Sequence, residues 1–158
     1  MKNTEEALKW IVGILQKHNI LFRISGGFAA RVYGSKRELA DIDIGMEKDY
    51  FPQILEDIKD YLVSGPEIYK DDELNLFAAT LTYKWQDIDI YPISALKFFN
   101  KKEKKWEDLQ HTFSNIFFTE MYGIKVPIIS RQNLIEYKNK LGREVDLIDV
   151  KEMLENKS

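Results

Sequence analysis

Two short segments of this chain repeat the pattern Asp-Ile-Asp-Ile, at residues 41–44 and again at residues 87–90. Alternation of acidic and apolar residues is typical of a β-strand, because successive side chains of a strand point to opposite faces of the sheet. Each segment is therefore predicted to bury its isoleucines and to present its aspartates on the other face. The chain must accordingly form a sheet with one apolar face and one face that carries carboxylates.

Two carboxylates so close together on one strand repel each other, and one would stay protonated unless a divalent cation neutralises the pair. Asp41 and Asp43 are thus predicted to be metal ligands. A cation held there can bridge the oxygens of a triphosphate and take up the charge that develops in phosphoryl transfer. The alternative is a solvated strand face or a helix cap, the more common role of an isolated Asp-x-Asp pair.

A pair of glycines precedes the first acidic segment. Residues 21–24 are mostly apolar and predict a strand, and residues 28–33 predict the beginning of a helix. Gly26 and Gly27 between them let the backbone approach a ligand, and the helix N-terminus offers free N–H groups to an anion. Ser25 is expected to add its hydroxyl to the same phosphate. An isolated Gly-Gly pair, in contrast, is usually only a turn.

In this order the features resemble the signature of the DNA polymerase β-type nucleotidyltransferase superfamily, in which Gly-Gly or Gly-Ser, a short helix and Asp-apolar-Asp follow one another. Residues 28–40 separate Gly27 from Asp41, a gap that the family tolerates. Gly34-Ser35 lies too close to Asp41 for a helix between them, so the phosphate turn is assigned to Gly26-Gly27. The resemblance implies an α/β (α+β) fold with a mixed, twisted sheet, helices packed on one face and the site open on the other.

The superfamily also carries a third carboxylate on a later strand. The run from Asp89 to Pro92 is similar to the Asp-apolar-His-Pro run of the small lincosamide and aminoglycoside nucleotidyltransferases, with Tyr91 where that subgroup has histidine. By this match Asp89 is the third metal ligand and the general base that takes a proton from an acceptor hydroxyl. Asp87 is the alternative third carboxylate. The resemblance further implies two Mg²⁺ ions and a nucleoside triphosphate, ATP above all.

The C-terminal part of the chain adds to the resemblance. Small members of the family often end with a strand, a helix capped by serine, a lysine, an arginine and an Asp-Leu pair, and residues 126–149 follow this order with Ser130 as the predicted N-cap. Lys138 and Arg143 are therefore expected to contact the phosphates or the acceptor. Lys36 and Arg37 are candidate charge stabilisers only because they lie in the loop just before Asp41. For Lys138 and Arg143 the alternative is a solvated cationic face.

Two further helices and a pair of strands are predicted from periodicity. Apolar residues at helical spacing predict helices over 5–17 and 50–62, with Ser64-Gly65-Pro66 ending the second, and residues 67–70 and 76–83 predict strands joined by a polar turn. The basic run at 97–105 is interpreted as a solvated linker or a helix start. An RNA-facing or substrate-facing patch is the alternative.

Size and composition limit the remaining choices. A chain of 158 residues without a linker rich in proline, glycine or serine predicts one domain over 1–158. The absence of cysteine excludes disulfides and thiolate zinc sites, and the net charge of −3 disfavours a protein that binds nucleic-acid backbones. No segment has the character of a signal peptide or a membrane span, so no membrane partner is predicted and a cytoplasmic location is expected.

The predicted function is transfer of a nucleoside monophosphate from a nucleoside triphosphate to a hydroxyl acceptor, with release of pyrophosphate. A small-molecule acceptor is favoured over nucleic acid, and a homodimer is a possible assembly. One alternative is a toxin-type nucleotidyltransferase that acts on tRNA or protein. Another, of a different class, is an inactive module that senses nucleotide or binds a partner chain. The presence of all three carboxylates favours an active enzyme.

Overall fold

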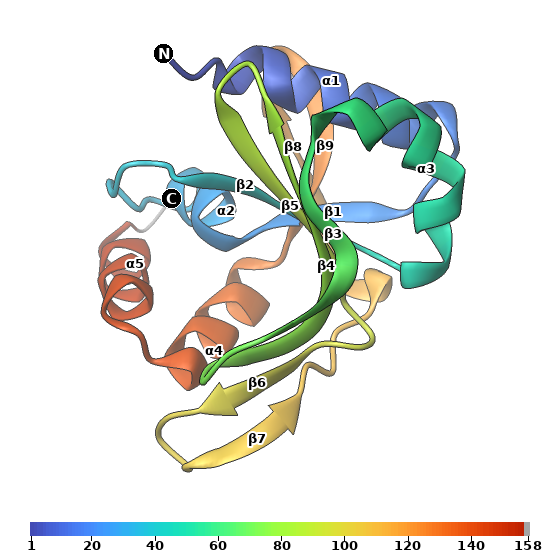
Figure 1. Cartoon of the computed structure of the whole chain (residues 1–158). Coiled ribbons are helices and arrows are strands. Elements are labelled where there is room, and N and C mark those ends of the chain that lie inside the picture. The colour runs from blue at the N-terminus through green and yellow to red at the C-terminus, as the bar shows by residue number, and fades with distance from the viewer. Residues whose placement is uncertain (157–158) are drawn as a thin grey trace.

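In the computed structural model, which describes residues 1–156, five α-helices and three short 3₁₀-helices surround one mixed sheet of nine strands (Figure 1). The helices are α1 (Thr4–Lys17), α2 (Gly26–Val32), α3 (Phe51–Ile58), α4 (Arg131–Leu141) and α5 (Glu144–Glu155), with η1 (Lys48–Tyr50), η2 (Lys59–Tyr61) and η3 (Phe113–Asn115). The strands are β1 (Phe22–Ser25), β2 (Asp41–Met46), β3 (Leu62–Lys70), β4 (Leu74–Tyr83), β5 (Gln86–Pro92), β6 (Lys97–Asn100), β7 (Lys105–Asp108), β8 (Ile116–Met121) and β9 (Ile124–Ile129).

The order of strands across the sheet is β7-β6-β4-β5-β2-β1-β9-β8, and β3 pairs with β4 outside this path. The pairs β2–β5 and β1–β9 are parallel, and the others are antiparallel. The two Asp-Ile segments therefore lie side by side in the middle of the sheet. Their register aligns Asp43 with Asp89 and Ile44 with Ile90.

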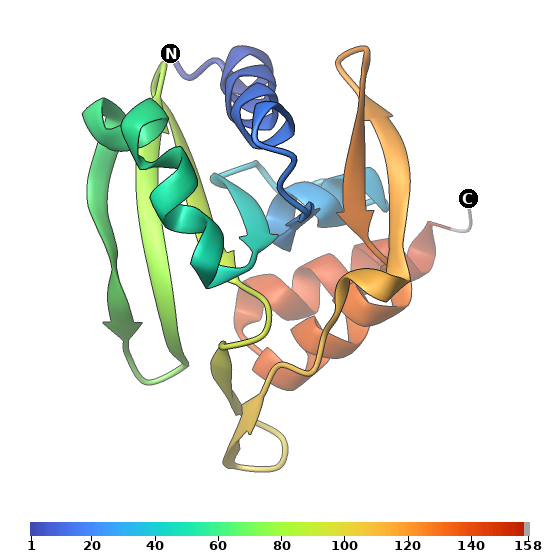
Figure 2. The same ribbon diagram turned by 90° about the vertical axis from the view of Figure 1, so that its right-hand side faces the viewer.

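The isoleucines of β2 and β5 form the centre of the main hydrophobic core. Ile42, Ile44, Ile88 and Ile90 are each 0% exposed and belong to one cluster with the apolar residues of α1 and α3. Burial of each such side chain contributes about 1.5–3 kcal/mol, so the alternation fixes which face of the sheet the helices cover. Figure 2 shows α1 and α3 on that side.

Helices α4 and α5 lie on the carboxylate side of the sheet, across from α1 and α3 (Figure 2). A second, smaller cluster of Leu76, Leu96, Phe98, Leu109 and Leu141 packs the end of α4 against β4 and β6. The predicted α/β fold class with a mixed sheet is confirmed. Helices cover one face as expected, and the last two helices additionally border the site on the other face.

The segment after α3 differs from the prediction. The helix gives way to η2 at Lys59, and β3 begins at Leu62, so Ser64-Gly65-Pro66 lies within a strand and does not end a helix. The pairing of β3 with β4 shifts register at this point. A β-bulge accommodates glycine and proline in a strand, which is why residues that usually mark turns occur inside this one.

The basic run at 97–105 is neither a linker nor a helix start. It forms β6, a turn and the beginning of β7, a hairpin that projects from the lower edge of the molecule in Figure 1. Among the described residues, no helix has the length and apolar character needed to cross a membrane.

Candidate active site

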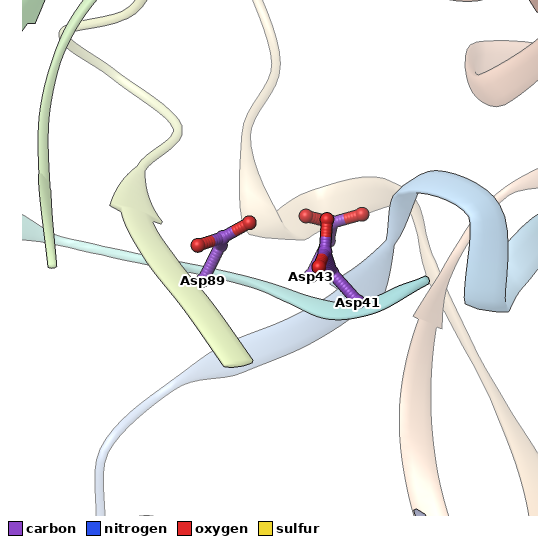
Figure 3. Close-up of side chains that lie close together, drawn as sticks. All are labelled: Asp41, Asp43 and Asp89. Carbon is purple, nitrogen blue, oxygen red and sulfur yellow. The ribbon is translucent and has the colours of Figure 1, made fainter. Parts of the chain in front are cut away.

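Three aspartates meet on the polar face of the central strands (Figure 3). Asp41 and Asp43 come from β2 and Asp89 from β5, and one carboxylate oxygen of each lies within 4.8 Å of the other two. Their backbones are fixed by the register of two neighbouring, well-packed strands. A cluster of hard carboxylate oxygens is the donor set that Mg²⁺ prefers, so these three residues fit the expected metal.

The cluster is electrostatically unfavourable without a cation. Burial, together with the neighbouring Asp89 and Asp41, raises the pKa of Asp43 to about 8. Burial likewise raises the pKa of Asp89 to about 6, although a 2.8 Å hydrogen bond from Thr80 opposes the rise. The pKa of Asp41 is also raised, by burial and by Asp87. A divalent cation would remove the repulsion and favour the ionised carboxylates.

The structure places the two candidate third carboxylates differently. Asp89 joins the cluster, whereas Asp87 is exposed and accepts a 2.7 Å hydrogen bond from Thr82. Asp87 pairs in register with Asp41, at the end of the strands where solvent has access. The alternation and the register thus place both beside the Asp41–Asp43 pair, and only the carboxylate of Asp89, the less exposed of the two, joins the cluster.

The two glycines leave space for side chains of the site itself. Gly26, with φ +61°, is the first residue of α2, and a Cβ atom there would overlap the carboxylate of Asp43. A Cβ atom at Gly27 would lie 3.0 Å from Nη2 of Arg37. The Gly-Gly pair therefore allows Asp43 and Arg37 to pack against the beginning of α2.

Ser25, at the N-cap position of α2, makes no capping hydrogen bond with its side chain and is 2% exposed. Its hydroxyl hydrogen-bonds with Tyr91, the residue that stands where the antibiotic-modifying subgroup has histidine. Burial and the nearby Asp43 raise the pKa of the Tyr91 hydroxyl, so this tyrosine is neutral at physiological pH. Ser25 thus connects the glycine turn to the floor of the site.

A cavity of about 520 Å³ opens beside the three aspartates. Its lining includes Gly26, Gly27 and three of the four predicted cations, namely Arg37, Lys138 and Arg143. Apolar and aromatic side chains line it as well, among them Ile68, Leu74, Leu76, Leu96, Tyr91 and Tyr137. Lys36 is exposed and does not line this cavity.

The cations of the wall are ion-paired with two aspartates of α5. Arg37 pairs with Asp149, Arg143 pairs with Asp146, and Lys138 lies between the two carboxylates. Lys138 is only 4% exposed, so it does not belong to a solvated face. Sequence reasoning assigned no role to Asp146 and Asp149. The available signal was their spacing of three residues, which places both on one face of a helix.

Comparison by sequence matches no family model and no curated protein. Comparison by structure finds clear similarities. A protein of Thermotoga maritima assigned as a nucleotidyltransferase has a TM-score of 0.73 at 18% identity, with 98% of this chain and 96% of that chain covered. The lincosamide antibiotic adenylyltransferase LnuA, solved with lincomycin, has a TM-score of 0.63 at 17% identity, with 98% of both chains covered.

The antibiotic-resistance factor ANT(2'')-Ia, solved with adenylyl-2''-tobramycin, has a TM-score of 0.61 at 13% identity, with 96% of this chain and 87% of that chain covered. At such identities the similarity establishes the fold. This chain therefore has the nucleotidyltransferase fold over nearly its whole length, and the resemblance seen in the sequence is confirmed at that level.

Proposed function

We propose that this chain, which has the nucleotidyltransferase fold, is a metal-dependent enzyme. It transfers a nucleoside monophosphate from a nucleoside triphosphate to a hydroxyl group of a small molecule. The favoured donor is ATP, so that the group transferred is AMP. The observation that carries the proposal is the cluster of Asp41, Asp43 and Asp89 at the edge of a cavity. Two structurally similar proteins support ATP as the donor. LnuA is a lincosamide antibiotic adenylyltransferase, and ANT(2'')-Ia was solved with adenylyl-2''-tobramycin.

Asp41, Asp43 and Asp89 would hold Mg²⁺, which supplies neutralisation of the triphosphate charge when bound. The acceptor oxygen forms a bond to the α-phosphorus, the bond from that phosphorus to pyrophosphate breaks, and the acceptor proton passes to Asp89. A bound cation favours the ionised form of Asp89, which is the form that accepts a proton. Asp89 is therefore suited to act as a general base.

The lining of the cavity supports a small acceptor. A groove for tRNA would be lined mainly by cations along the path of a phosphate backbone. This cavity instead combines its charged residues with apolar and aromatic side chains, among them Ile68, Leu76 and Tyr137. Such a lining fits the apolar surface of a compact molecule that carries a hydroxyl group.

The experiment that tests the proposal is thermal unfolding with each of four nucleoside triphosphates, with and without Mg²⁺, on the wild type, Asp43→Asn and Asp87→Asn. Ligand at about a hundred times its dissociation constant stabilises by roughly 2.7 kcal/mol, which is about 5–10 °C for a domain of this size. We expect a rise that requires Mg²⁺, is abolished by Asp43→Asn and is retained by Asp87→Asn. Release of pyrophosphate with a panel of hydroxyl compounds then identifies the acceptor.

Other results would point to other functions. A nucleotide that binds without Mg²⁺ and without turnover would favour an inactive sensing module. Pyrophosphate release with tRNA or protein, and with none of the small hydroxyl compounds, would favour a toxin-type nucleotidyltransferase. No shift with any nucleotide would overturn the proposal.

A further inference from the structure

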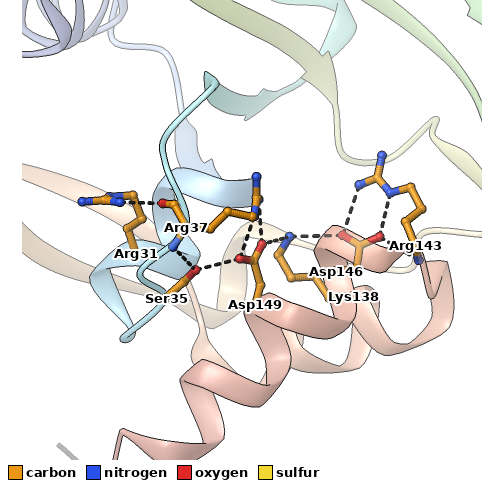
Figure 4. Close-up of polar contacts among 7 residues, drawn as sticks. All are labelled: Arg31, Ser35, Arg37, Lys138, Arg143, Asp146 and Asp149. Carbon is orange, nitrogen blue, oxygen red and sulfur yellow. Dashed lines mark hydrogen bonds and ion pairs between the residues drawn. The ribbon is translucent and has the colours of Figure 1, made fainter.

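Helix α5 carries two buried aspartates, and each of them holds one arginine of the cavity wall (Figure 4). Asp146 and Asp149 are both 0% exposed. A buried carboxylate is costly unless it is paired and fully hydrogen-bonded. The contacts made by these two side chains show how that requirement is met.

Asp149 accepts hydrogen bonds from three side chains. Arg37 donates through Nε at 3.0 Å and Nη2 at 2.8 Å, and the Ser35 hydroxyl donates at 2.7 Å. Nζ of Lys138 lies 3.0 Å from the same carboxylate. Burial alone would raise the pKa of Asp149, but these contacts outweigh it and lower the pKa to about 2. Asp149 is therefore ionised at any pH at which the protein works.

Asp146 repeats the arrangement for the second arginine. Arg143 donates to it through Nε at 2.6 Å, Nη2 at 3.1 Å and its backbone N–H at 3.2 Å. Lys138 contacts this carboxylate too, at 3.2 Å. Lys138 thus lies between both aspartates, and each aspartate holds one arginine in place. Three cations face two carboxylates, which leaves one net positive charge on the cavity wall.

One nitrogen of each guanidinium group takes no part in the contacts with the aspartates. Both are held by the Nε–Nη2 edge, and among the described residues Nη1 of either guanidinium has no hydrogen-bond partner. Figure 4 shows the guanidinium groups of Arg37 and Arg143 on the same side of Asp149 and Asp146. Both residues line the cavity, and the positive charge of Arg37 partly opposes the rise that burial causes in the pKa of Asp41.

The backbone of Arg37 is held as firmly as its side chain. Its N–H donates to the Ser35 hydroxyl at 3.3 Å, and its carbonyl accepts from Nη1 of Arg31 at 2.5 Å. An arginine loses side-chain entropy when a ligand orders it. If the protein has already ordered the side chain, binding of a phosphate no longer carries that cost.

We propose that Asp146 and Asp149 are positioning residues, which hold Arg37 and Arg143 as a preorganised pair of guanidinium groups for the polyphosphate of the nucleotide. Lys138 neutralises the two aspartates from inside the protein and acts on the nucleotide only through them. The inference rests on the proposed function, since it names how the same site binds the phosphates of its donor.

The test is a double-mutant cycle on binding of ATP with Mg²⁺, measured by calorimetry on wild type, Asp149→Asn, Arg37→Gln and the double variant. We expect each single change to raise the dissociation constant about tenfold and the double variant to be no worse than Arg37→Gln alone, because Asp149 acts through Arg37. Inorganic tripolyphosphate should show the same pattern, while adenosine, which has no phosphate, should bind all four proteins equally.

Two further variants separate orientation from charge and from stability. Arg37→Lys keeps the charge and loses the two-nitrogen contact with Asp149, so it should weaken binding of tripolyphosphate as much as Asp149→Asn does. It tests the orientation of the side chain independently, should Asp149→Asn fold poorly. Asp57→Asn removes a pair with Lys17 and His18 elsewhere in the molecule and should leave the dissociation constant unchanged.

The outcomes are distinguishable. If wild type binds ATP with Mg²⁺ and Asp149→Asn binds it equally well, or if the effects of Asp149→Asn and Arg37→Gln simply add, the inference is overturned and the proposed function stands. If wild type binds neither ATP nor tripolyphosphate, the proposed function is overturned together with the inference.

Discussion

At the scale of single residues, the glycine pair is explained by what occupies the space beside it. Asp43 fills the position of a Cβ atom at Gly26, and Arg37 crowds that position at Gly27. Gly26 also has a positive φ of 61°, which disfavours any residue with a Cβ atom. The two glycines are thus required by the residues of the site, in addition to any approach of phosphate to the backbone.

Gly26→Ala should consequently impair the site beyond its cost in stability. Alanine at a left-handed position costs about 1–2 kcal/mol, and here its methyl group would also displace Asp43. We expect loss of Mg²⁺-dependent stabilisation by ATP, measured by thermal unfolding. The matched control is Gly123→Ala, because Gly123 has φ +81° but nothing within 4 Å of an added Cβ atom. It should lose similar stability and keep nucleotide binding, and equal binding by both variants would contradict this account.

At the scale of elements, α4 owes its position to well-defined ends. The Ser130 hydroxyl accepts a 3.0 Å hydrogen bond from the N–H of Asn133, and Gly142 ends the helix with a left-handed φ of 62°. Between these ends α4 brings Tyr137 and Lys138 to the cavity. The caps therefore determine where the helix begins and ends, and so which of its residues face the site.

Ser130→Ala is expected to lower the free energy of unfolding by about 1 kcal/mol, because the N–H of Asn133 loses its acceptor. The affinity for ATP should not change, since the cap lies at the far end of α4 from Lys138. Urea unfolding measures the first quantity and calorimetry the second. Asn3→Ala at α1 provides a comparison, since Asn3 caps the N–H of Glu6 in the same way. An unchanged midpoint for Ser130→Ala would show that water replaces the cap.

At the scale of the whole molecule, the carboxylate cluster opposes the stability of the fold that carries it. The core beneath β2 and β5 holds three aspartates together although burial and mutual repulsion raise the pKa of each. Such a site is stable because the rest of the molecule is well packed, and a bound cation reverses the penalty.

Asp43→Asn should therefore make the protein more stable in the presence of a chelator, by on the order of 1–2 kcal/mol or roughly 2–8 °C. The amide is neutral without taking up a proton, so it avoids both the repulsion and the cost of protonating Asp43, whose pKa burial raises to about 8. Thermal unfolding in EDTA should show Asp43→Asn as the more stable protein. In Mg²⁺ with ATP the wild type should be the more stable of the two. Asp87→Asn is the control, because Asp87 is exposed and outside the cluster, and it should follow the wild type in both conditions. A wild type that is the more stable protein in EDTA would contradict the expectation.

A homodimer remains a prediction from the sequence, and light scattering of the purified protein would test it.

Local pattern determined much of this protein. The alternation at 41–44 and 87–90 specifies two strands, the buried face of each and the face that bears carboxylates, because the period of a strand is two residues. The caps at Asn3 and Ser130 and the glycines that begin α2 can likewise be recognised in the sequence, since each depends on neighbours a few residues away.

Only the tertiary structure decided the rest. Asp87 and Asp89 share a face of β5, and the register with β2, which no local pattern specifies, places Asp87 beside Asp41 and Asp89 beside Asp43. Only the carboxylate of Asp89 joins the cluster, because Asp87 lies exposed at the end of the strands. Arg37 meets Asp149 only because α5 docks beside the loop that follows α2, 112 residues away along the chain. Local pattern establishes which residue types face which way, whereas partners distant in sequence are chosen by the packing of whole elements.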